Sequence, residues 1–215
     1  MTLAGNNSIC PPEFTEIERK FLPAHDGWRT LPATRLHIRQ GYLNLDPERT
    51  VRVRLCEEIQ GIAPPVDPSD PLREKNDARY VNINDYPSTS PSLLREKPGS
   101  SPAGRGFLTV KGKSRGATRA EFEFPIPVRE ASTLLETLAL RPFVEKIRHC
   151  VELPPHVWEI DEFIGENLGL VLIEIELDNC NTPLLPPNWV GTEVTGDPRY
   201  ANASLVLDPF ARRRA

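Results

Sequence analysis

The sequence predicts a mainly β protein whose antiparallel strands close into a barrel. Charged residues recur at every second position in seven segments, and apolar residues occupy most of the positions between them. Side chains on a strand alternate between the two faces of a sheet, so each segment has one ionic and one apolar face. Only one clear amphipathic helix accompanies the roughly eight strands, too few to cover the apolar side of a flat sheet. Closure into a barrel also removes the sheet edges.

The expected strands occupy two blocks of the chain. They span residues 14–22, 34–45, 50–58, 107–113, 117–126, 142–153, 156–163 and 167–178. The first reads FTEIERKFL, which places Glu16, Glu18 and Lys20 on one face. The sixth places Lys146 and Arg148 together in the same way. Every one of these strands except 34–45 is therefore expected to contribute two or three ionic side chains to a common surface.

Two short helices are expected besides the strands. Residues 128–140 read VREASTLLETLAL, with Ala131, Leu134, Leu135 and Leu138 at the spacing of one helical face. The tail from 181 to 215 is rich in proline, and we expect a second short helix at about 199–207.

The chain is predicted to form a single domain over residues 1–215, with a core at about 13–61 and 107–209. Residues 62–106 are rich in proline and polar residues and show no sustained apolar period. Such a segment buries too little apolar surface to offset the conformational entropy that it would lose on folding. We interpret it as a flexible insertion that loops out of a hairpin, and one hypothesis gives it the role of contacting an unknown partner.

Composition argues against several classes of protein. The net charge is −4, and the concentrated basic run is the terminal RRR at 212–214, so nucleic-acid binding is not expected. No stretch approaches the ~20 apolar residues of a membrane span, and no signal segment is recognisable, which favours a cytoplasmic protein. The four cysteines are scattered without a CxxC pair, which argues against a zinc site and fits a reducing compartment.

The ionic faces carry both signs of charge. The cations are Lys20, Arg52, Arg54, Lys111, Lys113, Arg119, Lys146 and Arg148. The acids are Glu16, Glu18, Glu121, Glu123, Glu159, Asp161, Glu174, Glu176 and Asp178. These faces point either to solvent, which is the ordinary reason for alternation, or into the barrel. An inward arrangement requires a water-filled bore, because buried charges are costly unless they are paired or bound to ions. Arginine and lysine bind phosphate oxygens, and carboxylates bind Mg²⁺ or Mn²⁺, so opposed charges suit a metal–polyphosphate complex.

Several segments resemble one family. EIERK at 16–20 matches the E-x-E-x-K signature of the CYTH superfamily, the triphosphate tunnel metalloenzymes. Further segments similar to that family follow in the expected order: QGYLN, TVRVR, LTVKG, RAEFEFPIP, KIRH, WEIDEF, GLVLIEIEL and WVGTEVTGDPRYAN. The chain looks most similar to the single-domain microbial branch, whose members are typically inorganic triphosphatases. Two departures are the insertion, which replaces a short hairpin connection, and His149, which stands where a tyrosine is usual.

The resemblance implies an eight-stranded antiparallel tunnel with a charged interior and a bound Mg²⁺ or Mn²⁺. It implies a set of metal ligands, namely Glu16 and Glu18, helped by acids such as Glu123, Asp161, Glu174 or Glu176. It also implies a set of phosphate-binding cations, namely Lys20, Arg52, Arg54, Lys111, Arg119, Lys146 and Arg148. Lys146 and Arg148 are the candidates for a catalytic role, orienting the attacking water or stabilising the leaving charge. Lys113 does not belong to the family pattern, and we expect it to be exposed.

The predicted function is metal-dependent hydrolysis of a triphosphate, foremost inorganic tripolyphosphate to diphosphate and phosphate. One alternative is hydrolysis or cyclisation of an organic triphosphate, such as a nucleotide or thiamine triphosphate. Another is a non-catalytic polyphosphate-binding module in which the insertion docks a partner. The expected ligand is thus a triphosphate, and a homodimer is a possible assembly.

Overall fold

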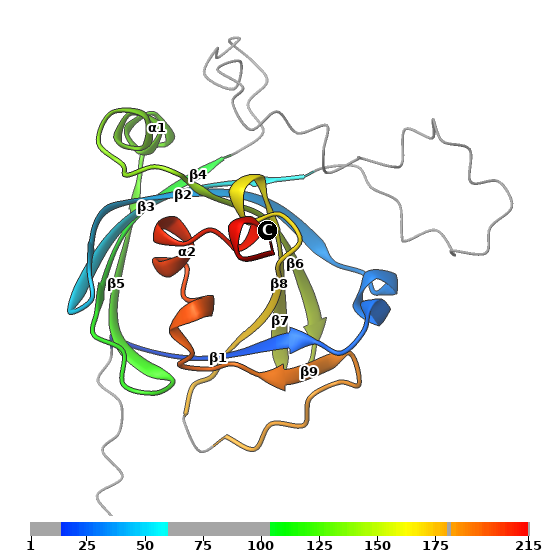
Figure 1. The fold of residues 1–215 in the computed structure, drawn as a ribbon. Coiled ribbons are helices and arrows are strands. Elements are labelled where there is room, and N and C mark those ends of the chain that lie inside the picture. Colours follow the sequence, from blue (N-terminus) through cyan, green and yellow to red (C-terminus); the bar gives the residue numbers. More distant parts are fainter. Residues whose placement is uncertain (1–13, 60–103, 180–181, 215) are drawn as a thin grey trace, which may run out of the picture.

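The computed structural model of the protein describes residues 14–59, 104–179 and 182–214 (Figure 1). The predicted insertion at 62–106 lies almost entirely outside the described residues, so its flexibility and its partner role stay predictions. Within the described part, no helix has the length and apolar character needed to cross a membrane.

Eight antiparallel strands form a closed barrel, as the sequence predicts. They are β1 (Thr15–Pro23), β2 (Thr34–Asp46), β3 (Arg49–Glu58), β4 (Arg105–Gly112), β5 (Thr118–Ile126), β6 (Val144–Leu153), β7 (His156–Ile164) and β8 (Val171–Glu176). Their order around the barrel is β5-β4-β3-β2-β6-β7-β8-β1, and a further pairing of β5 with β1 closes it. Strand β1 closes the ring because Thr15–Ile17 pair with β5 and Glu18–Phe21 pair with β8.

Some strand boundaries differ from the prediction. Strand β4 begins at Arg105, so the last residues assigned to the insertion belong to the barrel. Strand β8 is shorter than expected, because the 3₁₀ helix η4 (Gly165–Asn167) precedes it, and Asp178 lies beyond its end. A ninth strand, β9 (Val190–Glu193), pairs with β1 in the tail, where no strand was expected. Four residues among prolines are too few to show a period of two.

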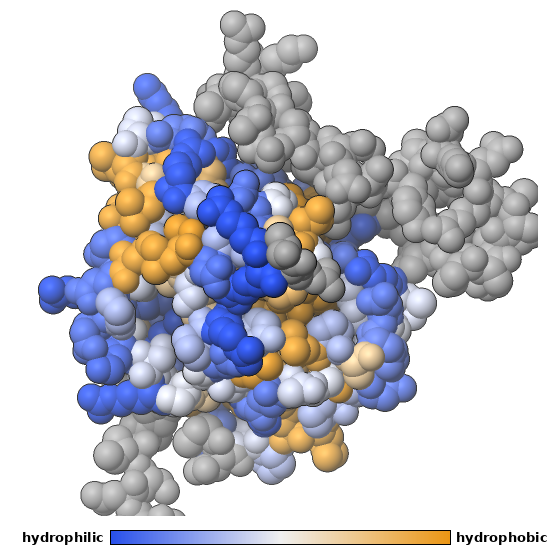
Figure 2. Space-filling model, viewed as in Figure 1, coloured by the Kyte–Doolittle hydropathy of each residue, from blue (hydrophilic) through white to orange (hydrophobic). Residues whose placement is uncertain are grey.

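The first predicted helix is α1 (Val128–Thr137), which packs on the outside of the barrel (Figure 1). Ala131 and Leu135 are fully buried against Val53 of β3. The assignment of Leu138 to the buried face is wrong: it is the C-cap residue and 63% exposed, because the helix ends before it. Figure 2 shows apolar side chains at the surface in the region of α1. Leu138 and Leu140, which follow the helix in the sequence, are both exposed.

The barrel is covered on its outside by short elements from the loops and the tail. The 3₁₀ helix η1 (Asp26–Thr30) brings Trp28, and the tail brings Trp189, onto an apolar cluster. That cluster contains the outward residues of β1, β6, β7 and β8: Ile17, Phe21, Val151, Trp158, Ile160, Ile173 and Ile175. Each such side chain contributes about 1.5–3 kcal/mol when fully buried. The main hydrophobic core therefore lies outside the barrel wall, which leaves the interior free for charge.

One end of the interior is apolar. The tail forms η5 (Pro198–Tyr200), α2 (Ser204–Leu207) and η6 (Phe210–Arg214), in place of the single helix expected at 199–207. Helix α2 lies within the outline of the barrel in Figure 1. Its Leu205 and Val206 are buried against Tyr42, Phe163 and Leu172 from the strands. These apolar residues, together with α2, close that end of the barrel next to the ionic part of its interior.

Candidate active site

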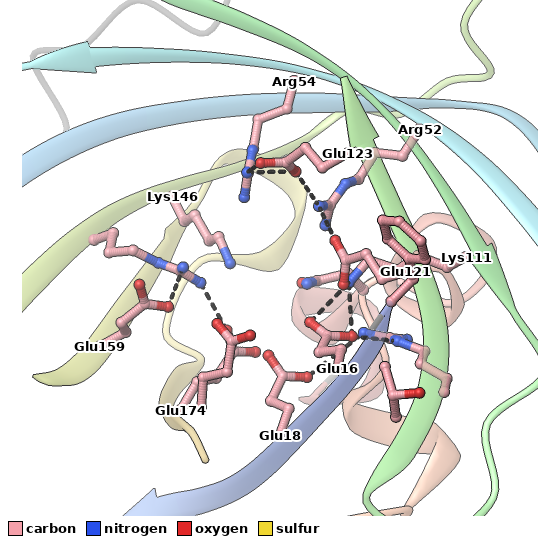
Figure 3. A pocket seen from close by; sticks show the side chains of 16 residues that line it. Glu16, Glu18, Arg52, Arg54, Lys111, Glu121, Glu123, Lys146, Glu159 and Glu174 are labelled. Carbon is pink, nitrogen blue, oxygen red and sulfur yellow. Dashed lines mark hydrogen bonds and ion pairs between the residues drawn. The ribbon is translucent and has the colours of Figure 1, made fainter. Parts of the chain in front are cut away.

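The ionic faces of the strands converge inside the barrel (Figure 3). Two cavities of about 370 and 440 Å³ lie there. Every site residue predicted from the sequence, except Asp161, lines one or both of them. The residues common to both cavities are Glu16, Glu18, Arg52, Lys111, Arg119 and Asn202. The charged side chains thus face a shared interior space and not the surrounding solvent.

One group of side chains joins β3 to β5. Arg54 Nη2 donates to both carboxylate oxygens of Glu123, at 2.8 and 2.7 Å, and the Thr109 hydroxyl donates to the same carboxylate at 2.9 Å. Arg52 lies 3.6 Å from Glu123 and 3.9 Å from Glu121. The Nε atoms of Arg52 and Arg54 are buried and have no hydrogen-bond partner among the described residues. These arginines therefore retain donors that no acceptor in the described part of the chain satisfies.

A second group surrounds Glu16 on β1. Lys111 Nζ donates to both oxygens of Glu16, at 2.9 and 3.0 Å, and Arg119 Nε donates at 2.6 Å. Lys111 also donates to Glu121 at 2.6 Å. Burial alone would raise the pKa of Glu16, but Lys111 and Arg119 outweigh it and hold that pKa far below the ordinary range. Glu16 is thus a carboxylate throughout the physiological range.

A third group is centred on Arg148 of β6. Its guanidinium donates to Glu159, to Glu174 at 2.6 Å, and twice to Asp161 at 2.8 Å. Lys20 of β1 donates to Glu174 as well and lies 2.8 Å from Glu18. Burial opposes charge on Glu174, yet Lys20 and its other cationic neighbours lower its pKa well below the usual value. Four strands, β1, β6, β7 and β8, are therefore tied together across this side of the bore.

Asp161 differs from the other predicted residues in its position. It is fully buried, at 0% exposure, and lines neither cavity. Lys146 Nζ donates to its Oδ2, and Arg148 donates to both Oδ1 and Oδ2. Burial and then Arg148 lower the pKa of Lys146, against the opposing effect of Asp161. The contacts of Asp161 are those of a group that holds two cations in place.

The remaining acids supply oxygen ligands suited to a hard divalent cation. Burial raises the pKa of Glu176, and the nearby Glu16, Glu159 and Glu18 raise it further. A cation placed among these carboxylates would relieve their repulsion, and carboxylate oxygens are the ligands that Mg²⁺ and Mn²⁺ prefer. No three His, Cys, Asp or Glu side chains in the described part are already arranged to hold a metal ion. The carboxylates therefore fit a divalent metal in their chemistry. In this structure Glu16 and Glu174 accept hydrogen bonds from lysine and arginine side chains.

Lys113 behaves as expected from its departure from the family pattern. Its side chain is mostly exposed and pairs with Glu48 at 2.6 Å, at the rim of the larger cavity. It does not reach the ionic groups described above.

Glu121, Glu159 and Asn202 are polar lining residues that received no site role from the sequence. Glu121 and Glu159 belong to the alternating pattern, so the signal for them was present. Asn202 lies in the tail between η5 and α2, where no strand periodicity exists, and its signal was its place at the end of the family-like segment WVGTEVTGDPRYAN. Only the folded path of the tail brings it to the cavities.

Comparison with known proteins gives two curated relatives. The inorganic triphosphatase of Acetivibrio thermocellus is 37% identical over 195 residues, which cover 91% of this chain and 95% of the relative. The inorganic triphosphatase of Nitrosomonas europaea is 31% identical over 199 residues, covering 90% and 97%. A crystal structure of an inorganic triphosphatase is 27% identical, covers 89% of this chain and 94% of its own, and has a TM-score of 0.48. No protein-family model matches the chain.

Proposed function

This chain belongs to the inorganic triphosphatase family, and we propose that it hydrolyses inorganic tripolyphosphate to diphosphate and phosphate with the help of Mg²⁺ or Mn²⁺. The proposal extends to membership of the CYTH superfamily, in its single-domain microbial branch. The observation that carries it is the interior of the barrel, where arginine and lysine face carboxylates around a cavity of about 370 Å³. Such a bore offers a linear polyanion several cations along its length.

The proposed phosphate-binding residues are Lys20, Arg52, Arg54, Lys111 and Arg119. The buried Nε–H groups of Arg52 and Arg54 have no partner within residues 14–59, 104–179 and 182–214, and this supports the role because a phosphate oxygen would satisfy them. Burial, followed by Arg52, lowers the pKa of Arg54, so an incoming anion would stabilise its charge. Arginine at these positions also permits two-point contact with a phosphoryl group.

The proposed metal ligands are Glu16 and Glu18, assisted by Glu174, Glu176 and Glu123. When bound, the metal would neutralise charge on the phosphate oxygens and act as a Lewis acid. The raised pKa of Glu176 supports this assignment, because it results from burial and from the repulsion of the neighbouring carboxylates, which a bound cation would relieve. Binding of the substrate supplies a competing partner for Lys111, Arg119 and Lys20, and the carboxylates they now hold become available for the cation.

We assign Lys146 and Arg148 to the charge that develops on the leaving diphosphate. Phosphoryl transfer depends on positioning and on stabilising charge as it moves to the leaving group. Both side chains line the cavity and are buried, so water screens them weakly. Asp161 is then a positioning residue and not a ligand, because its oxygens are occupied by these two cations.

The test is phosphate release by the purified protein from tripolyphosphate, ATP and thiamine triphosphate, with Mg²⁺ and with Mn²⁺. We expect the highest kcat/KM with tripolyphosphate and no turnover after metal is removed by a chelator. Preference for an organic triphosphate would instead support the alternative substrates, and binding without turnover would support a non-catalytic module.

Two variants test the binding surface. Arg54→Met removes an interior cation and is expected to raise KM for tripolyphosphate. Lys113→Met removes an exposed cation that is paired with Glu48, and its KM is expected to be unchanged. Equal effects of the two substitutions would refute the assignment of the interior as the binding site.

A further inference from the structure

Asn202 lies at the junction of the two interior cavities. It lines both, together with five charged residues that come from the strands. Unlike those residues, it is neutral and comes from the tail, between η5 and α2. It is therefore a polar group placed on the bore by an element that the strand pattern does not include.

The tail holds Asn202 in a fixed position. The backbone N–H groups of Ser204 and Leu205 donate to Ala201, at 2.9 and 3.1 Å, and so fold the chain tightly around it. Leu205 and Val206 are buried in the apolar end of the barrel. Buried Asn167 adds two bonds to the same segment, donating to the Leu205 carbonyl at 3.4 Å and accepting from the Phe210 N–H at 2.8 Å. The amide of Asn202 is thus carried by a rigid support.

The Oδ1 atom of Asn202 is buried and has no hydrogen-bond partner among the described residues. A buried acceptor without a partner costs about 1–3 kcal/mol, so a bound molecule that donates a hydrogen bond to Oδ1 would be stabilised there. Phosphate oxygens are acceptors, and they would find their donors on the neighbouring lysines and arginines. A water molecule is a donor of suitable size for Oδ1.

We propose that Asn202 positions the attacking water, an inference that rests on the proposed triphosphatase function. A linear triphosphate lying along the bore in the smaller cavity presents its terminal phosphoryl group to the junction. In-line attack then comes from beyond that end, on the side of the larger cavity, where Asn202 stands. The water oxygen forms a bond to the terminal phosphorus, and the bond from phosphorus to the bridging oxygen breaks, leaving its electron pair on diphosphate. The water proton passes to an oxygen of the phosphate that forms.

A neutral amide suits this position. It accepts a hydrogen bond from the water without adding negative charge beside an approaching polyanion. A carboxylate there would repel the substrate and compete for the metal. Glu16 and Glu18, which line the same junction, are already assigned to the cation.

The experiment compares Asn202→Ala with Asn44→Ala in the full chain. Asn44 is a matched control, since its Oδ1 is also buried without a partner in the described part, but it lines neither cavity. For each protein we would measure kcat with tripolyphosphate, the Kd of non-hydrolysable imidotriphosphate with Mg²⁺, and the thermal midpoint. We expect kcat of Asn202→Ala to fall by about 10²-fold with an unchanged Kd and midpoint, and Asn44→Ala to keep its kcat.

Three results would overturn the inference while the proposed function stands. They are an unchanged kcat in Asn202→Ala, a loss of imidotriphosphate affinity as large as the loss of kcat, and the same fall of kcat in Asn44→Ala. If Asn202→Ala does not fold, Asn202→Ser, which keeps a shorter hydrogen-bond acceptor, takes its place. Its kcat should likewise fall while its Kd for imidotriphosphate stays unchanged. A wild-type protein that releases no phosphate would overturn the proposed function and this inference together.

Discussion

Asp161→Asn separates a positioning role from a metal-binding role at the most buried acid of the site. The carboxylate is at 0% exposure and accepts hydrogen bonds from Lys146 and from Arg148, the latter twice at 2.8 Å. The amide keeps the shape of the side chain and removes the charge that balances two buried cations. Removing one partner of a buried ion pair costs about 3–5 kcal/mol.

That loss is large enough to measure by thermal unfolding. A change of 1 kcal/mol shifts the midpoint by about 2–4 °C in a protein of 150–250 residues, so we expect a decrease of about 6–20 °C. Tripolyphosphate should restore part of the decrease, because the anion supplies the charge that Asp161 no longer provides to Lys146 and Arg148.

Metal affinity gives the decisive comparison, measured by titration calorimetry with Mg²⁺ and Mn²⁺. Asp161→Asn should bind metal as the wild type does, since both oxygens are already held by cations. Glu176→Gln should lose metal affinity without loss of stability, because burial and the neighbouring acids Glu16 and Glu159 raise its pKa and make its charge unfavourable in the folded state. A loss of about tenfold or more in the metal affinity of Asp161→Asn, with an unchanged midpoint, would show that Asp161 is a ligand.

Three further substitutions test other parts of the structure. Glu18→Gln should abolish metal-dependent phosphate release and leave the circular dichroism spectrum intact, and an active variant would remove Glu18 from the ligand set. Burial and then Arg148 lower the pKa of Lys146, so its ammonium loses its proton below the ordinary value of 10.5 and phosphate binding weakens as the pH rises. Lys146→Arg should move this alkaline decline of kcat/KM to higher pH, and an unmoved decline would exclude Lys146 as its source. Gly106→Ala should destabilise the fold by about 1–3 kcal/mol in denaturant titration, because the added Cβ would lie 2.7 Å from the Ile126 carbonyl oxygen and 2.8 Å from Ala131 Cβ. Equal stability would show that both the end of β5 and α1 can shift to admit the methyl group.

The barrel and most of its interior could be predicted from the sequence because a period of two is a local property. Glu16, Glu18 and Lys20 must share a face on any strand that contains them, wherever that strand lies in the sheet. The prediction that the ionic faces point into the barrel needed a second observation, because a sheet with one face in solvent produces the same alternation. Scarcity of helix was the informative feature, and the closed sheet order bears out the reasoning from it.

Depth along the bore could not be predicted in this way. Asp161 and Glu159 are two residues apart on β7 and share its ionic face, yet Asp161 is fully buried and Glu159 lines the cavity. The difference depends on the stagger of neighbouring strands, which places Arg148 directly opposite Asp161 in the β6–β7 register. The position of Asn202 at the cavities could not be predicted for a related reason, since it depends on how the tail packs against Tyr42 and Phe163.

A charged interior has a structural consequence for the rest of the protein. A bore filled with ionic groups cannot supply the apolar burial that stabilises most domains, so the apolar faces of the strands must be covered from outside. Helix α1, Trp28 and Trp189 do this over most of the wall. Over β5 the cover is incomplete, and Phe122 and Phe124 remain 42% and 50% exposed, with Phe14 stacked on Phe122 at 4.9 Å. Because the stabilising core and the reactive interior lie on opposite sides of one strand wall, substitutions on the outer face should change stability while the geometry of the site is kept.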